Sequence, residues 1–196
     1  FMAHSQTKEL NKIPLGSMDF YVTEWNGTTP EDSALETEKN MIGRTKNGAT
    51  INYGATWYTA ESDDGKAKKR RLVGETASIS YGAITWNANT ISTLIATARV
   101  EEKNNKRIAK IGGVTNDNGK RYLIRGVHRD PIDGDIRITG VGVNTGGWEA
   151  AFKPDSETVI QPTFELDPLD ADGTLMIYEE EIIESSTTDA HTEEGT

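Results

Sequence analysis

The chain has no cysteine among its 196 residues and only three histidines. Without cysteine there are no disulfide bonds, thiolate nucleophiles or cysteine-based zinc sites. No apolar run approaches the ~18 residues of a membrane-spanning helix, and the first residues, 1–6, resemble neither a signal peptide nor a transit peptide. We therefore expect a soluble protein without thiol chemistry.

Positive charge is scarce overall, with 21 Lys and Arg against 31 Asp and Glu and a net charge of -10. Such a surface repels DNA phosphates, so we expect no ordinary duplex binding. The distribution is uneven, because 103–129 is mainly basic and 179–196 is acidic without Lys or Arg. Opposite patches of this kind can meet across a subunit contact, although random clustering on a solvated surface explains them equally well.

The sequence lacks the patterns of common catalytic sites. Of the histidines, His4 lies near the start, His191 near the end, and His128 at the end of an expected strand. There is no Gly-x-Ser-x-Gly elbow and no His-Glu-x-x-His zinc helix. Catalysis requires a nucleophile or base positioned by its neighbours, so we expect no enzyme and no catalytic residue.

Two segments resemble ligand-binding loops without matching them. The glycines of 140–147 depart from Gly-x-Gly-x-x-Gly spacing and precede an expected strand, which favours a hairpin. Asp170, Asp172, Gly173 and Glu179 fit part of a calcium loop, but Pro168 stands where its first acidic ligand belongs. We expect a turn between antiparallel strands here, and neither a metal nor a cofactor.

Short strand patterns separated by turn residues fill most of the chain. They occupy 18–25, 50–61, 72–86, 106–114, 120–128, 135–143, 148–152, 158–166 and 174–183. Strands at this spacing predict an antiparallel sandwich or barrel, and 19 glycines suit its turns and bulges. Within 50–61, we expect Ile51, Tyr53 and Trp57 to face inward.

One segment has a helical period. Asn89 is a candidate N-cap, and Ile91, Leu94, Ile95 and Ala98 form an amphipathic stripe. Several β-branched residues weaken the helix propensity. The pair at 104–105, two asparagines, is expected to end the helix.

The remaining segments show no clear period. We expect an N-terminal arm at 1–17, a β domain at 18–183 with long loops at 28–47 and 62–71, and an acidic disordered tail at 184–196. A short helix within 30–40 is compatible with proline in a first helical turn.

The loop 62–71 carries a dense group of cations: Lys66, Lys68, Lys69, Arg70 and Arg71. A basic run of this kind attracts anionic partners. Because the chain is acidic and Asp63 and Asp64 adjoin the run, we favour an inter-subunit contact over nucleic acid. A merely solvated loop explains the run nearly as well.

The second half of the chain resembles bacteriophage tail tube (major tail) proteins. The resemblance covers 79–181 and is carried by 122–131, 135–142 and 147–155. Its strongest part is 164–175, Phe-Glu-Leu-Asp-Pro-Leu-Asp-Ala-Asp-Gly-Thr-Leu, which is similar to the final strand pair and acidic turn of that family.

The resemblance implies a mainly β fold: an antiparallel β-sandwich or half-barrel with one packed α-helix, long loops and terminal arms. It implies a structural virion protein that closes into rings, expected to be hexameric, which stack head-to-tail into a hollow tube. DNA would pass through the lumen into the host without specific binding. Partners would be further copies and other phage tail proteins, with no membrane, in a tail assembled in the bacterial cytoplasm.

A second hypothesis is a β-sandwich binding module, such as a carbohydrate-binding or adhesin domain of a phage tail tip or cell surface. Trp25, Trp57, Trp86 and Trp148 would then be candidate platforms for sugar stacking. Tryptophans at strand positions more often belong to a core or an interface.

Overall fold

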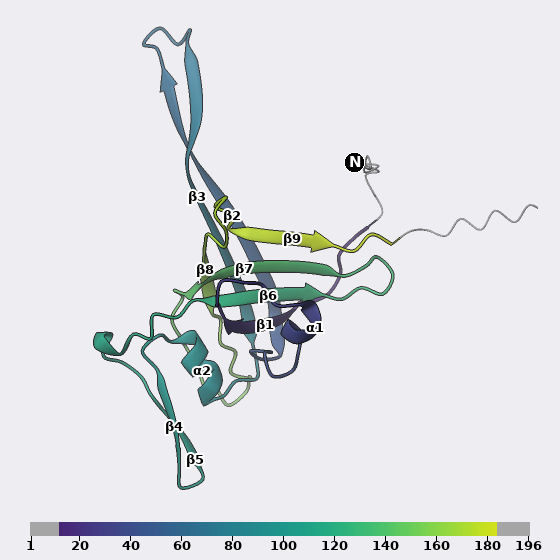
Figure 1. Ribbon diagram of the computed structural model, residues 1–196, viewed down its shortest axis with the longest axis vertical. Helices are drawn as coiled ribbons and strands as arrows, with labels where there is room; N and C mark the ends of the chain where they lie inside the picture. The colour runs from purple at the N-terminus through teal and green to yellow at the C-terminus, as the bar shows by residue number, and fades with distance from the viewer. Residues whose placement is uncertain (1–11, 184–196) are drawn as a thin grey trace, which may run out of the picture.

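The computed structural model describes residues 12–183 and is mainly antiparallel β (Figure 1). The main sheet has the order β1-β6-β7-β8-β3-β2, with β9 also pairing β7. Its strands are β1 (Asp19–Glu24), β2 (Thr45–Glu61), β3 (Lys68–Ala83), β6 (Tyr122–His128), β7 (Ile136–Asn144), β8 (Thr163–Asp167) and β9 (Met176–Glu180). A separate hairpin consists of β4 (Arg99–Lys103) and β5 (Lys106–Lys110). The mainly β prediction is confirmed.

The main sheet curls, as contacts between strands that are distant in its order show. Phe20 of β1 stacks on Tyr81 of β3 with ring centroids 4.2 Å apart. The segment 40–45 covers the outer edge of β1: the Val22 amide donates to the Asn40 carbonyl at 2.8 Å, and the Thr45 hydroxyl donates to the Met18 carbonyl at 2.6 Å. The result is a half-barrel, as expected.

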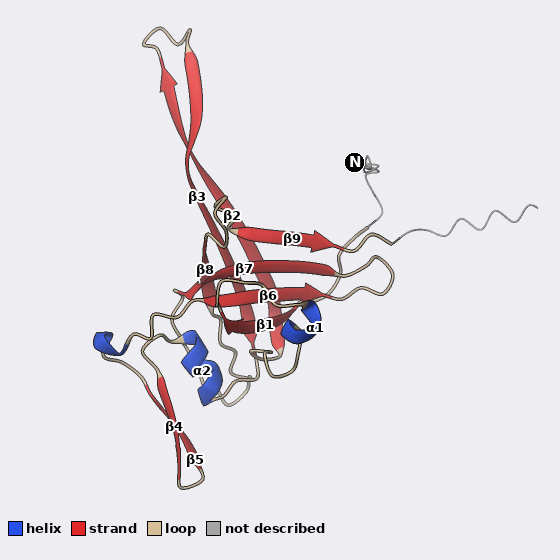
Figure 2. Ribbon diagram, viewed as in Figure 1, coloured by secondary structure: helices blue, strands red, loops and turns tan. Residues whose placement is uncertain are grey.

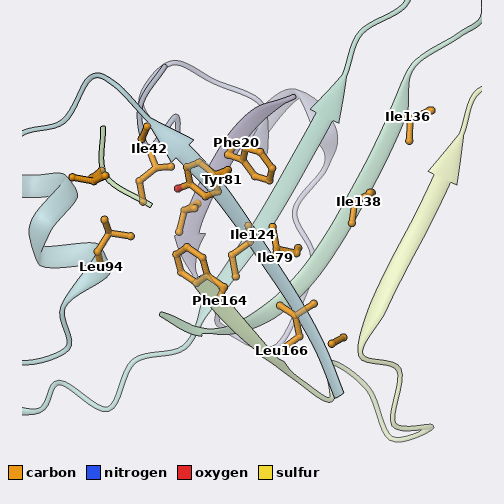
Figure 3. Packing of buried hydrophobic residues seen from close by; sticks show 14 residues of the cluster. Phe20, Ile42, Ile79, Tyr81, Leu94, Ile124, Ile136, Ile138, Phe164 and Leu166 are labelled. Carbon is orange, nitrogen blue, oxygen red and sulfur yellow. The ribbon is translucent and has the colours of Figure 1, made fainter. Parts of the chain in front are cut away.

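The main core lies inside this curl and draws on most strands of the sheet (Figure 3). Phe20, Ile79, Ile124 and Phe164 have no exposed surface. Burying each such side chain contributes roughly 1.5–3 kcal/mol. A smaller cluster of Leu35, Leu123 and Val141 lies on the opposite face of β6 and β7.

The predicted helix exists but is shorter than expected. α2 spans Ala88–Leu94, and its N-cap is Asn87, not Asn89. The Asn87 side chain accepts from the backbone amides of Asn89 (2.8 Å) and Thr90 (3.3 Å). Leu94 packs against the main core. The β-branched segment after Leu94 leaves the helix and enters β4, so the helical prediction beyond 95 is wrong.

The expected loops are shorter than predicted. The segment 28–47 contains the one-turn helix α1 (Asp32–Leu35), and β2 begins within it at Thr45. In 62–71, β3 begins at Lys68, which lies opposite Glu61, so only 62–67 is a loop. Cross-strand pairing, which the polar composition does not reveal, accounts for this difference.

The strand expected at 148–152 is absent from the structure, where this segment is irregular. β7 ends at Asn144, whose side-chain amide donates to the carbonyls of Leu94 (2.9 Å) and Gly147 (2.7 Å). These bonds turn the chain away from the sheet before Trp148. A short 3-10 helix (Val114–Asn116) follows the β4–β5 hairpin.

No helix within 12–183 combines the length and hydropathy needed to cross a bilayer. The expectations for 1–11 and for the tail 184–196, together with His4 and His191, lie outside the described residues.

Candidate assembly surfaces

The β2–β3 hairpin extends far beyond the body of the domain, opposite to the β4–β5 hairpin (Figure 2). Of β3, only 78–80 pairs with β8. Toward the tip, the hairpin is therefore a two-stranded ribbon with both edges unpaired within the described chain. We call its distal part, 53–75, the arm. A two-stranded hairpin alone is marginally stable in water, so further contacts would stabilise the arm.

One face of the arm continues the face that packs on the core. Ile51 lies opposite Ile79 and packs against the core, and Tyr53 and Trp57 follow at the alternate positions of β2. Yet Tyr53 is 56% exposed and Trp57 58% exposed. The alternation predicts their face correctly, but their expected burial is wrong, because the body ends near Ile51 and the described chain places nothing opposite the arm.

The arm exposes further apolar side chains. Leu72, opposite Trp57, is 37% exposed, and Tyr58 is 62% exposed. Val73 lies at an irregularity in the strand register and is also exposed. A group of exposed apolar side chains on one projection is typical of an interaction site.

The five cations singled out in the sequence gather at the end of the arm, and all are exposed: Lys66, Lys68, Lys69, Arg70 and Arg71. Within the described chain, the first two pair locally, Lys66 with Asp64 at 3.8 Å and Lys68 with Glu61 at 3.0 Å. The Ser62 hydroxyl, donating to Asp64 at 2.6 Å, lowers the pKa of that carboxyl. Their role in an inter-subunit contact stays a prediction.

The base of the arm is acidic. The Tyr53 hydroxyl donates to Glu75 at 2.5 Å, and this bond raises the pKa of Tyr53. Both residues line a recess of about 430 Å³, which Glu165 and Asp167 of β8 also line. The tip of the arm is therefore basic, whereas its base is acidic.

An ionic network that the sequence reading missed fixes α1 to the sheet. The side chain of Glu36 is 7% exposed and that of Arg125 is 4% exposed. Glu36 accepts from Arg137 at 2.8 Å and from Arg129 at 2.9 Å, and the first bond is the main cause that raises the pKa of Arg137. Arg125 donates to Asp32 at 2.7 Å.

A signal for this network was present in the strand pattern. Arg125 lies between Leu123 and Val127 on one face of β6, and both of these are buried. An arginine within an apolar alternation requires an anionic partner. Only the fold identifies its partners as Asp32, at 2.7 Å, and Glu36, at 3.4 Å, both far away in the sequence.

Other candidate residues take local structural roles. The Asp170 carboxylate accepts from the amides of Asp172 (3.0 Å) and Thr174 (2.9 Å) and so closes the β8–β9 turn. His128 is buried, with Nδ1 3.0 Å from the Ser17 carbonyl oxygen. Between residues 12 and 183, no group of three or more His, Asp or Glu is arranged to hold a metal ion.

The four tryptophans do not form one platform. Trp25 packs on the smaller cluster around Leu35, and Trp57 lies on the arm. Trp86 and Trp148 meet edge to face with centroids 5.8 Å apart, and Phe152 lies 6.2 Å from Trp86. Of the four tryptophans, only Trp86 and Trp148 therefore belong to a local aromatic group, which lies near 148–152.

The structure is similar to two solved chains of gene transfer agent (GTA) particles. One comes from the virion of a native GTA particle, with 14% identity, a TM-score of 0.42, and coverage of 83% of this chain and 95% of that one. The other comes from the tail of an empty GTA particle with C6 symmetry, with 13% identity, a TM-score of 0.44 and the same coverage. No family model and no curated protein matches the chain.

Proposed function

We propose that this chain is a structural subunit of a phage-type tail tube, which assembles into stacked rings, with six copies in each. The observation that carries the proposal is the arm. Its core-type face, with Tyr53, Trp57 and Leu72, leaves the body and has nothing to pack against within the described chain. A neighbouring copy would cover this face and convert a marginal ribbon into part of a packed surface.

The open strand edges support the same proposal. Among residues 12–183, β2 has no strand partner on its outer edge, and β9 pairs only with β7. Unpaired edges favour pairing with another chain, and closure into a ring removes them. Heterologous contacts give rings when the rotation closes and stacked filaments when it does not. Both kinds of contact are required in a tube of stacked rings.

The charge of the chain suits a conduit for DNA. A net charge of -10 disfavours adhesion of phosphates to the wall. We infer that DNA passes the subunit without specific binding, that other tail proteins are its further partners, and that the assembled protein resides in the virion. No catalytic step is part of this proposal.

Electron microscopy of the purified chain at high concentration, with mass from light scattering, tests the assembly directly. We expect hollow tubes, or rings of about 129 kDa if six copies of the 21.5 kDa chain associate. A monodisperse monomer at every concentration counts against self-assembly of the chain.

The cations of the arm provide a residue-level test. Reversing Lys68, Lys69, Arg70 and Arg71 to Glu should block polymerisation without unfolding the subunit, since all four are exposed. The matched control exchanges Lys and Arg at the same four positions and keeps the charge. Normal tubes from the reversed variant contradict an inter-subunit contact through these four cations.

A sugar-binding module is the second candidate, and the aromatic group of Trp86, Trp148 and Phe152 favours it. Phe152 is 77% exposed and Trp148 37% exposed, and exposed rings offer apolar faces for stacking. A sugar-induced change in tryptophan fluorescence that disappears in Trp148→Ala would support this function. Its absence across a panel of cell-surface glycans would oppose it.

A further inference from the structure

The β4–β5 hairpin, which we call the basic hairpin, is a second projection with an excess of positive charge. Its residues 99–110 include five cations (Arg99, Lys103, Lys106, Arg107, Lys110) and two anions. Both anions are paired across the hairpin, Glu101 with Lys110 at 2.8 Å and Glu102 with Arg107 at 2.9 Å. Its tip thus keeps uncompensated cations.

Lys103 and Lys106 are the cations at that tip, and they lie directly opposite one another across the strands. Both are exposed, and neither has an ion-pair partner within 12–183. Like charges at opposed positions destabilise a hairpin. Asn104 and Asn105, with φ of 53° and 57°, form a tight turn that holds the two lysines together. An anionic partner would relieve this repulsion.

An anionic surface that could supply this partner lies in the body of the same chain. Glu165, Asp167, Asp170 and Asp172 form what we call the acidic shoulder, at the end of β8 and the turn to β9. Glu165, Asp170 and Asp172 are exposed, and the segment 165–175 contains no Lys or Arg. Of these four carboxylates, only Asp167 has an ion-pair partner within the described chain, namely Arg121 at 3.0 Å.

The two surfaces lie on opposite sides of the body (Figure 1). The acidic shoulder adjoins the base of the arm, because Glu165 and Asp167 line the same recess as Tyr53 and Glu75. The basic hairpin points away from the arm (Figure 1). In a head-to-tail stack, the end with the basic hairpin meets the end with the arm of the next copy.

We infer that the basic hairpin of one copy docks on the acidic shoulder of the next copy, with Lys103 and Lys106 facing Glu165 and Asp172. This inference rests on the proposed function and adds a second contact to the one made by the arm. Complementary charges would fix the register and direction of stacking, because the wrong orientation brings like charges together. The occupant is a second copy and not nucleic acid, because a matching anionic surface of the right direction is present on this chain.

Charge reversal tests the contact. In Lys103→Glu/Lys106→Glu, we expect the critical concentration for assembly to rise about tenfold at low salt, and the difference to shrink as salt screens the charges. Lys39→Glu/Lys153→Glu changes the net charge equally at two exposed sites outside both surfaces, and we expect less than about a twofold change. Glu165→Lys/Asp172→Lys should impair assembly like the hairpin variant, and the combined fourfold variant should restore it.

Zero-length carbodiimide cross-linking of the unaltered chain, in a mixture of ¹⁵N-labelled and unlabelled protein, reads the contact itself. We expect mixed-isotope links from Lys103 or Lys106 to Glu165, Asp170 or Asp172. Tubes without these links, or equal effects of the hairpin and control variants, overturn the inference but leave the proposed function standing. If the hairpin variant forms normal tubes but no longer binds duplex DNA, the inference is also overturned. If the unaltered chain neither assembles nor forms these links, both the inference and the proposed function are rejected.

Discussion

Phe20 and Tyr81 stack face to face, with their ring centroids 4.2 Å apart and their planes 7° apart. Their strands, β1 and β3, are not neighbours in the sheet. This contact therefore holds the two sides of the half-barrel together. Tyr81 is buried and its hydroxyl has no hydrogen-bond partner in the described structure, and burial raises the pKa of that hydroxyl.

Two substitutions in this pair should distinguish the contribution of ring packing to stability from the contribution of the buried hydroxyl. Phe20→Ala should lower the free energy of unfolding by about 3–5 kcal/mol, because it leaves a cavity in the core. Tyr81→Phe should cost nothing or stabilise the fold, since it removes a buried hydroxyl without a partner. Urea unfolding followed by circular dichroism measures both. A loss of more than about 1 kcal/mol in Tyr81→Phe would show that the hydroxyl has a hydrogen-bond partner.

The buried network around Glu36 gives the second prediction. Glu36→Ala removes the carboxylate that accepts from Arg129 and Arg137, so we expect a loss of about 3–5 kcal/mol in unfolding free energy. Glu38→Ala is the matched control. Its side chain is 92% exposed and 4.0 Å from Arg44, so the change should stay below about 1 kcal/mol. Equal losses would mean that the network does not hold α1.

Trp57 should matter for assembly and not for folding. Trp57→Ser should change the free energy of unfolding by less than about 0.5 kcal/mol, because the side chain is 58% exposed. Its loss should raise the critical concentration for assembly by about thirtyfold, the effect of a typical interface tryptophan. Trp25→Ser, in the smaller cluster, should do the reverse and destabilise the subunit. Unimpaired assembly of Trp57→Ser would exclude the arm face as an interface.

Acid should destabilise the subunit through carboxylates whose pKa the fold lowers, among them Asp130, Asp170 and Glu181. Backbone amides lower the pKa of Asp130, hydrogen bonds from Thr174 lower that of Asp170, and the Asp135 amide and Arg137 lower that of Glu181. Their ordinary values are 3.8, 3.8 and 4.5. A lowered folded-state pKa contributes stability that is complete above the ordinary value and is lost as pH falls through the folded value.

Thermal unfolding from pH 6 down to pH 2 measures this dependence. The melting temperature should be steady above about pH 5 and fall below it. In Asp170→Asn the decline should be shallower, since one of these groups no longer titrates. An unchanged slope in that variant would show that Asp170 does not contribute to the acid transition.

The sequence predicted the strands well where alternation is strong, as in β1, β6 and β7. The prediction failed where the same local pattern is compatible with both a helix and a strand. The segment after Leu94 contains apolar residues at helical spacing, yet it forms a hairpin, since β-branched residues and a pair of asparagines favour strands and a tight turn. The strand predicted at 148–152 does not form, because the side-chain amide of Asn144 donates two hydrogen bonds that turn the chain away from the sheet.

The candidate surface was predictable in composition but not in shape. The cations of 66–71 could be read directly from the sequence. The burial of Tyr53 and Trp57 could not, because alternation specifies a face and not whether anything lies opposite it. The Glu36 network depends on contacts between distant segments, which only the fold defines. The opposition of Lys103 to Lys106 is local and follows from the tight turn at 104–105.

The two unpaired edges of the arm have a consequence for the free subunit in solution. An exposed ribbon with apolar side chains is a template for uncontrolled pairing, and edge strands commonly carry lysine as a safeguard. Lys68, Lys69, Arg70 and Arg71 occupy this position on β3. The same cations that we propose to join copies would thus also keep subunits apart by mutual repulsion, so that premature aggregation is suppressed until an oppositely charged surface is correctly presented.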